Sequence, residues 1–411
     1  MRKIYSIIVL IICLFQPILK ADSWRILFYM DSSDNLSDMA FKSLTEMMQA
    51  QVNNTVECFI QIHAYHDVGL RYYLDSNRLQ LIETITLTGN SQQDFIDAAT
   101  WSFADNTADH TMLIFSNHGW GILDPRWNDT TQKWMIEQDI VKRSRIIEHQ
   151  KNHRGFMFNH NSHTYLTNND LVAGLEYIKN QLLLNKNLDV LVFDTCMGAM
   201  IEVGYQVAPY VDYMIGCQSC ALTDGLEYKG IMELLKGEYN TPRNVAMSMV
   251  DIFDAYYNIH DSKGIYTHSA FDLYYMNETC EALDRLATIL LNMPNAFNIL
   301  EAARKDTPRL CMWPMYTDMI EFFIQSKKYI PDNSDFTDAL DLLINSHSQM
   351  IISYCAGYDV KDDVHGSAIY CPFKHIESSY RNTIFAQSSQ WMNLLQLICS
   401  EDISTGEWTV G

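Results

Sequence analysis

The chain has 411 residues and a formal net charge of −21, from 29 basic and 50 acidic side chains. Such an acidic surface disfavours binding to nucleic acid and to anionic membranes. It would attract basic peptides, unless it serves solubility alone. Hydrophobic residues make up 48% of the chain, which supplies material for a large core. The length fits two or three domains, or one large α/β unit with an appended region.

Residues 1–21 have the pattern of a secretory signal peptide. Arg2 and Lys3 precede an apolar run from Ile7 to Phe15, which is short for a membrane span. An uncleaved anchor is the alternative. Removing the segment takes away three basic residues and no acid, so the charge changes from −21 to about −24. We expect a secreted or extracytoplasmic protein with no membrane contact after signal removal.

Strands and helices alternate in the first part of the mature chain. The expected elements are a strand at 24–30, a helix containing Met39 to Met48, a strand at 56–62, a hairpin-like excursion at 71–74 and 79–87, and a helix at 91–103. This alternation favours a mostly parallel sheet with helices on both faces. Asp31 and Asp34 could bind calcium, although acids are common in turns and no clear calcium motif is present.

Two apolar runs end in residues that could carry chemistry. The run from His110 to Ser116 leads to His118 and a glycine-rich turn, and the run from Leu188 to Asp194 leads to Cys196 and a helix. Both runs read as parallel strands, whose carboxyl edge is where ligands bind in open α/β sheets. The N–H groups that open a helix would also lower the pKa of the thiol.

His118 and Cys196 are therefore a candidate catalytic dyad, although about 78 residues separate them. The thiolate would be the nucleophile and the imidazole the general base and acid. The N–H groups of Gly119 and Cys196 would act as oxyanion donors. A lone buried cysteine is more often inert packing, so the prediction needs both residues at one edge.

These residues resemble the clostripain family of cysteine peptidases, whose relatives include the caspases, legumain and gingipains. The resemblance is carried by His118-Gly119 after an apolar strand, by the segment 194–197, and by Glu202-Val203 one helical turn further on. It covers most of the mature chain. It implies a caspase-hemoglobinase-like fold, in which 22–260 form the peptidase domain.

The resemblance also implies the site and its specificity. His118 and Cys196 would be the catalytic dyad, and Asp194 would lie in a pocket for a basic side chain, with cleavage after Arg or, less readily, Lys. The alternative for Asp194 is a strand-end acid that orients the loop. Asp224 would supply a second carboxylate, which favours Arg through bidentate bonds. The segment around Asp224 departs from the family's usual text, which weakens the prediction of specificity.

Residues 122–165 read as a long irregular insertion with a cluster of basic residues. The resemblance suggests a zymogen that cleaves itself in this loop, preferably at 142–145 (Lys-Arg-Ser-Arg). Solvated charge on a flexible loop is the alternative. After the insertion, Thr167 and Asp170 resemble a capping box before a helix at 171–184.

Nine cysteines follow the signal segment. If Cys196 stays reduced, eight remain, an even number compatible with disulfides in an oxidising compartment. Cys217 and Cys220 form a C-x-x-C pair, but without a second pair at zinc-finger spacing we do not expect zinc.

The remaining chain is expected to continue the fold as an α+β extension on the same core, residues 261–411. The expected elements after Cys196 are a parallel strand at 211–216, helices at 230–236, 244–257 and 278–292, a strand at 267–272, and two family landmarks at 316–322 and 365–372. His268 and His365 are expected to be structural.

The predicted function is a secreted cysteine endopeptidase that forms a thioester acyl-enzyme and needs no metal or organic cofactor. Its partners would be peptides or proteins with basic residues. One alternative is a catalytically inactive relative that binds basic peptides or a partner protein. Another is a peptide ligase that shares the acyl-enzyme. The sequence contains no G-x-S-x-G motif, so it gives no support for a serine hydrolase.

Overall fold

The computed structural model describes most of the chain after residue 21. The described residues are 22–32, 37–64, 66–76, 78–124, 126–128, 133–135, 156–159, 162–222, 224–238, 240–261, 264–310, 314–372 and 374–399. None of the helices in these ranges has the length and apolar character that crossing a bilayer requires.

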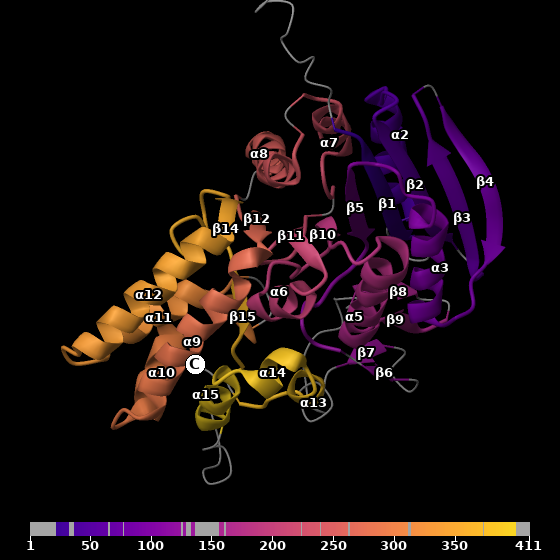
Figure 1. The fold of residues 1–411 in the computed structure, drawn as a ribbon. Helices are drawn as coiled ribbons and strands as arrows, with labels where there is room; N and C mark the ends of the chain where they lie inside the picture. Colours follow the sequence, from indigo (N-terminus) through magenta and orange to yellow (C-terminus); the bar gives the residue numbers. More distant parts are fainter. Residues whose placement is uncertain are drawn as a thin grey trace, which may run out of the picture.

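Nine strands form one sheet in the order β14-β12-β11-β10-β5-β1-β2-β3-β4 (Figure 1). These strands are β1 (Trp24–Asp31), β2 (Val56–Ala64), β3 (Val68–Leu74), β4 (Leu79–Thr86), β5 (His110–Ser116), β10 (Leu188–Asp194), β11 (Val211–Gly216), β12 (Thr267–Asp272) and β14 (Ile351–Ala356). The central strands β2, β1, β5, β10 and β11 run parallel, and antiparallel strands flank them on both sides. The predicted mostly parallel sheet is confirmed.

Helices cover both faces of this sheet. They are α2 (Ser37–Gln49), α3 (Ser91–Phe103), α5 (Asn168–Tyr177), α6 (Ile201–Val207), α7 (Tyr228–Leu235), α8 (Pro242–His260), α9 (Met276–Leu291), α10 (Ala296–Asp306), α11 (Met319–Lys327), α12 (Ser334–Met350), α13 (Ser378–Arg381), α14 (Ile384–Ser388) and α15 (Trp391–Ile398). A π-helical turn (Ile178–Leu182) follows α5, and a 3₁₀ turn (Leu273–Tyr275) precedes α9.

The buried strands contribute to two cores because successive side chains point to opposite faces. From β1, Ile26 and Phe28 join one core with α2, α7 and α8, whereas Leu27 and Tyr29 join the other with α3, α5 and α6. Figure 1 shows these two groups of helices on either side of the sheet. The β1 strand is buried throughout, as the apolar run predicted for a central parallel strand.

The C-terminal helices α9 to α15 extend the second of these cores. Trp391 is fully buried against Phe322 and Phe323, and its indole N–H donates to the carbonyl of Tyr370. A two-stranded sheet of β13 (Tyr316–Asp318) and β15 (Ala368–Tyr370) connects this region to the start of α6, because Ala368 forms a bridge with Met200. The C-terminal residues thus share one buried cluster with the main sheet, while a domain boundary near residue 260 remains a prediction.

The insertion at 122–165 is less irregular than predicted. β6 (Arg126–Asn128) pairs with β7 (Lys133–Met135), and β8 (Phe156–Asn159) pairs with β9 (Thr164–Leu166). Phe156 and Phe158 bury their rings, one against Phe193 and the other against Tyr165. The β8 strand itself is irregular, because Met157 has a φ of 57° and the pairing with β9 shifts register between Phe156 and Asn159. The predicted cleavage segment 142–145 lies outside the described residues.

The helix predicted at 171–184 also differs from the structure. The capping box is confirmed, because Thr167 and Asp170 each bond to the other's backbone N–H. The α-helix that it starts ends at Tyr177, and the chain leaves the π-helical turn through Leu184 and Asn185, both with positive φ. The apolar pattern continues beyond Tyr177, which is why a longer helix was predicted, but the backbone changes there from an α-helix to a π-helical turn.

Candidate active site

The two strands that carry the candidate dyad are neighbours and end together. Ser116 of β5 pairs in register with Asp194 of β10, and the Ser116 hydroxyl donates to Asp194 Oδ2 at 3.1 Å. His118 and Cys196 each lie two residues beyond this pair. Both line a solvent-open cleft of about 740 Å³, together with Asp194 and Asp224. The ends of β5 and β10 therefore open onto the same cleft.

The histidine turn is held from both sides by its neighbour Asn117. The buried Asn117 amide donates to the Asp31 carbonyl at 2.7 Å and accepts from the Phe158 N–H at 2.9 Å. These bonds tie the turn to the end of β1 and to β8. We did not predict a role for Asn117 from the sequence, although its place in the polar edge beside His118 was the available signal.

Gly119 brings the histidine turn against the cysteine peptide. A Cβ atom at this position would lie 2.4 Å from the Cys196 carbonyl oxygen and 2.6 Å from Thr195 Oγ1. Only glycine permits such a close backbone approach. The assignment of the Gly119 and Cys196 N–H groups as oxyanion donors remains a prediction.

Cys196 lies in a sharp turn between β10 and α6. Met197 has a φ of 58°, which for a bulky residue costs on the order of 1 kcal/mol. Hydrogen bonds hold this conformation, from Met197 N–H to the Ser219 carbonyl at 3.0 Å and from Ala199 N–H to the Cys217 carbonyl at 2.9 Å. The cysteine turn is therefore fixed by the segment that follows β11.

The thiol of Cys196 is not pre-ionised in this arrangement. Its Sγ accepts a hydrogen bond from Ala221 N–H at 3.2 Å, which favours the thiolate. A hydrogen bond with the Cys220 thiol, followed by desolvation, outweighs this and raises the pKa of Cys196 well above its ordinary value. At neutral pH, Cys196 is a thiol that needs a base to ionise it.

Asp194 is the less exposed of the two acids that line the cleft. Its Oδ2 accepts hydrogen bonds from the Tyr228 hydroxyl at 2.6 Å and from Ser116, while desolvation raises the pKa of the carboxyl. Gly225, at a φ of 66°, packs so closely that a Cβ there would lie 3.0 Å from Asp194 Oδ2. The carboxyl is thus oriented by three neighbouring segments.

Asp224 lies at the open rim of the same cleft. Its side chain is 48% exposed, and its Oδ2 accepts from the Tyr256 hydroxyl at 3.0 Å. Lys42 of α2 places its ammonium 3.6 Å from the same oxygen. Both predicted acids line the same cleft, but Lys42 already faces Asp224.

The C-terminal region supports the segment that follows β11. The buried Gln218 amide donates to Asp318 Oδ2 at 2.8 Å and accepts from the Gly366 N–H at 3.0 Å. Asp318 also accepts from the backbone N–H groups of His365 and Glu321. These bonds connect 217–221, which contact Cys196, to the start of α11.

Glu202 makes a second connection to the C-terminal region. This fully buried side chain of α6 accepts from the Tyr370 N–H at 2.8 Å and from the Tyr380 hydroxyl at 3.4 Å. Burial raises the pKa of Glu202 to about 8, so the carboxyl is mainly protonated at neutral pH. The family motif predicted its position but not this partner.

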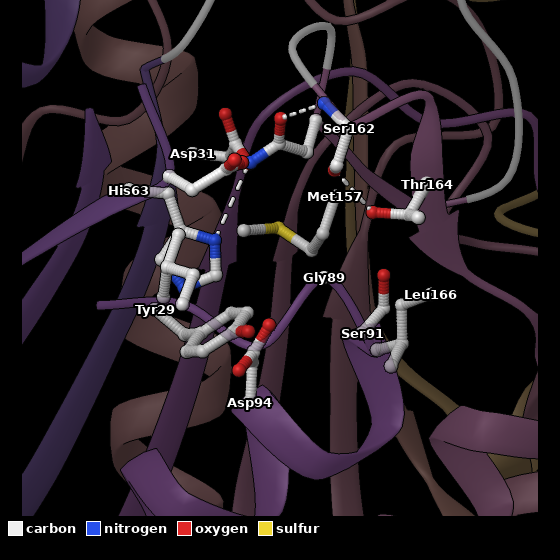
Figure 2. Close-up of a pocket in the computed structure, with 13 residues that line it drawn as sticks. Tyr29, Asp31, His63, Gly89, Ser91, Asp94, Met157, Ser162, Thr164 and Leu166 are labelled. Atoms are coloured by element: carbon white, nitrogen blue, oxygen red, sulfur yellow. Dashed lines mark hydrogen bonds and ion pairs between the residues drawn. The ribbon is translucent and has the colours of Figure 1, made fainter. Parts of the chain in front are cut away.

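A smaller pocket, drawn in Figure 2, shares Asp31 with the cleft as a lining residue. His63 pairs there with Asp31 at 3.4 Å and with the Gln61 amide at 3.0 Å. No cysteine is among the described lining residues. Asp34, the other candidate calcium ligand, lies outside the described residues, and those residues contain no group of three or more His, Cys, Asp or Glu side chains placed to hold a metal ion.

The two other histidines named in the sequence lie away from the dyad. His268 is fully buried, its ring stacks on Phe253 at 4.2 Å, and burial lowers its pKa to about 3. His365 faces Glu321 at 3.2 Å. The eight cysteines that the structure describes keep their thiols with no disulfide among them, so the disulfides that their number allowed are not present there.

Comparison with known proteins identifies the class of this site. Residues 142–396 match the model of the clostripain family. Because the match spans more than half of the chain, the chain belongs to the clostripain family. It is therefore a cysteine peptidase, a hydrolase, as the resemblance predicted. Comparison with curated proteins finds no match.

Solved structures show the same fold. An inactive zymogen C11 protease from Parabacteroides distasonis superposes with a TM-score of 0.63 at 15% identity, over 92% of this chain and 99% of that chain. A secreted C11 cysteine protease from Bacteroides thetaiotaomicron, in complex with an irreversible peptide inhibitor, gives 0.64 at 15% identity, over 91% and 99%. At this identity the likeness establishes the fold, and the predicted caspase-like architecture is confirmed.

Proposed function

We propose that this chain is an endopeptidase that cleaves after Arg, and less readily after Lys, with His118 and Cys196 as its catalytic dyad. The observation that carries the proposal is the convergence of these two residues with Asp194 and Asp224 on one cleft. The net charge of −21 supports it, because such a surface attracts basic substrates.

The basic side chain of the substrate enters the cleft toward the two acids. Asp224 receives the guanidinium at the rim, and Asp194 receives it at depth. There the desolvated carboxyl gains a cation that stabilises its ionised form. A planar guanidinium can bond to both acids, whereas an ammonium is a single point of charge. This geometry favours Arg over Lys.

The scissile carbonyl then lies over Cys196. His118 accepts the thiol proton as the sulfur attacks the carbonyl carbon, and the N–H groups of Gly119 and Cys196 bind the oxyanion. The C–N bond breaks as His118 gives the proton to the departing amine, which leaves a thioester. Water, deprotonated by His118, attacks the thioester, and the acid leaves as the proton returns to sulfur. No metal or organic cofactor takes part.

The raised pKa of Cys196 fits a chain that is made as a zymogen. A neutral thiol in the uncut chain reacts slowly, and a cut between the histidine and cysteine segments, preferably at 142–145, would release the surrounding loops. A structural neighbour described as an inactive zymogen supports this step. Secretion, as stated for another neighbour, would place the active form outside the cytoplasm.

Labelling with an arginine-based, thiol-reactive probe tests nucleophile and specificity together. We expect the probe on Cys196 by peptide mapping, with labelling slowed roughly tenfold to a hundredfold in Asp194→Asn and about tenfold in Asp224→Asn. A norleucine-based probe serves as the control, because its rate should not depend on either acid. Labelling of another cysteine, or equal rates for both probes, contradicts the proposal.

An inactive protein that binds basic peptides is the second candidate, and the neutral thiol of Cys196 favours it. The two candidates differ in turnover. An Arg-containing fluorogenic peptide is cleaved by the enzyme and only bound by the inactive relative. Adding an amine acceptor and weighing the products then distinguishes hydrolysis from peptide ligation.

A further inference from the structure

Cys220 lies beside the nucleophile without a part in the acyl-transfer steps. The residues on either side of it contact the cysteine turn: Ser219 accepts from the Met197 N–H at 3.0 Å, and Ala221 N–H donates to Cys196 Sγ at 3.2 Å. Cys220 is also the side chain that contributes most to the raised pKa of Cys196. Both side chains are half-buried, and Cys196 opens onto the cleft.

The other cysteine of the C-x-x-C segment is arranged differently. Cys217 is buried, and its thiol donates to the carbonyls of Thr195 at 3.2 Å and Ser219 at 3.0 Å. It is engaged with backbone, as packing cysteines are. Within this segment, Cys220 is therefore the residue whose sulfur faces the nucleophile.

We propose that Cys196 and Cys220 form an oxidisable dithiol, a modification site at which a peroxide converts the nucleophile reversibly into an intramolecular disulfide. The consequence for activity rests on the proposed function of Cys196. The modification itself depends only on the two sulfurs.

The reaction balances with one peroxide and two thiols. The Cys196 sulfur, once deprotonated, attacks a peroxide oxygen, the O–O bond breaks, and the released hydroxide takes a proton to become water. Cys220 then attacks the sulfur of the resulting sulfenic acid, the S–O bond breaks, and a second water leaves. Two thiols are oxidised to one disulfide, and the peroxide is reduced to two waters.

The neighbouring thiol decides whether oxidation is reversible. A sulfenic acid without a thiol nearby is oxidised further to sulfinic acid, which dithiol reductants do not restore. Because Ser219 and Ala221 already bond to the cysteine turn, Cys196 and Cys220 need little backbone movement to reach disulfide geometry. Cys220 therefore protects the nucleophile, and the disulfide holds the peptidase inactive until it is reduced.

The test treats the full chain with hydrogen peroxide, followed by alkylation, digestion and mass spectrometry. We expect a linked peptide pair containing Cys196 and Cys220, lighter than the two thiol peptides by two hydrogens. Arg-peptide hydrolysis should fall about tenfold or more and return after dithiothreitol. In Cys220→Ser, the same treatment should lower activity relative to the untreated variant, and dithiothreitol should not restore it. Mass spectrometry should then find sulfinic acid on Cys196.

Cys217→Ser is the matched control, because it changes the neighbouring thiol of the same segment and should oxidise and recover as the unaltered chain does. A linked pair containing Cys217, no linked pair at all, or full recovery of Cys220→Ser each overturns the proposal. If the chain shows no hydrolysis, the linked pair still reports on the dithiol, and the proposed function alone fails.

Discussion

Two regions contribute to the candidate site by different means: the edge of the sheet that carries the proposed dyad, and the C-terminal region. At the edge, each functional side chain lies within a few residues of the end of an apolar strand, as His118 does after β5 and Cys196 after β10. The C-terminal region reaches the site through single buried contacts, from Asp318 to Gln218 and from Tyr370 to Glu202. The chemistry is thus local to the strand ends, whereas its support is long-range.

This difference separates two kinds of substitution. Changes at the edge should remove the reaction and leave the fold, because the reacting groups face a cleft. Changes at the long-range contacts should alter stability or positioning, because the groups are buried.

Replacing the proposed nucleophile should have the largest effect on activity and little effect on stability. We expect Cys196→Ala to lower kcat for an Arg peptide by roughly a thousandfold or more, with His118→Ala similar. Thermal unfolding should shift by only a few degrees. The control is Cys355→Ala, which removes another half-buried thiol, from the edge strand β14. If the Cys355 variant were as inactive as the Cys196 variant, residues at the site would not differ from supporting residues in their effect on activity.

The same division explains what could be predicted from the sequence. Apolar runs and the residues at their ends are local patterns. The order of residues in the sequence therefore predicts β5 and β10, and it places His118 and Cys196 just after them. The partner of Gln218 lies 100 residues away, and no local pattern identifies it. The positive φ of Met197 could not be predicted either, because bulky residues rarely adopt this conformation and the sequence therefore does not indicate it.

Glu202 should make stability depend on pH. Its folded pKa is about 8, whereas an unfolded chain leaves a glutamate near ~4.3, so the folded state holds a proton that the unfolded state releases between these values. Stability should therefore fall as pH rises through this window, with the full loss reached above about 8.

Glu202→Gln removes this dependence while it keeps the acceptor for the Tyr370 N–H. We expect the variant to be more stable than the unaltered chain by roughly 2–5 kcal/mol near pH 9 and about equal near pH 4, from urea unfolding. Activity near neutral pH should change little. A constant difference in stability at every pH would show that Glu202 is not the titrating group.

Gln218 tests whether the C-terminal region acts on the reaction at all. Gln218→Ala leaves the Gly366 N–H and one bond to Asp318 unsatisfied, which should cost about 1–3 kcal/mol. If the Gln218–Asp318 contact holds residues 217–221 in place against Cys196, its loss should lower kcat about tenfold and leave KM nearly unchanged.

The matched control for Gln218 is Gln325→Ala. Gln325 is also a buried amide of the C-terminal region, and it bonds to Glu321 without touching the segment after β11. It should lose similar stability and keep kcat. Equal losses of kcat in both variants would mean that the region contributes stability only.

Replacing Lys42, which pairs with Asp224, should give the smallest effect. Its ammonium lies 3.6 Å from Asp224 Oδ2, and the two side chains are 39% and 48% exposed, so a substrate guanidinium must compete with it. We expect Lys42→Met to raise kcat/KM for Arg peptides about twofold to fivefold, with a smaller gain in high salt.

The control is Lys229→Met on α7, which removes the same charge from a solvent-exposed pair with Glu233. A gain confined to Lys42→Met shows that the lysine masks the outer acid of the specificity pocket, because both variants change the net charge equally. A gain in both variants would assign the effect to overall charge. A loss in Lys42→Met alone would mean instead that the lysine holds Asp224 in place for the substrate.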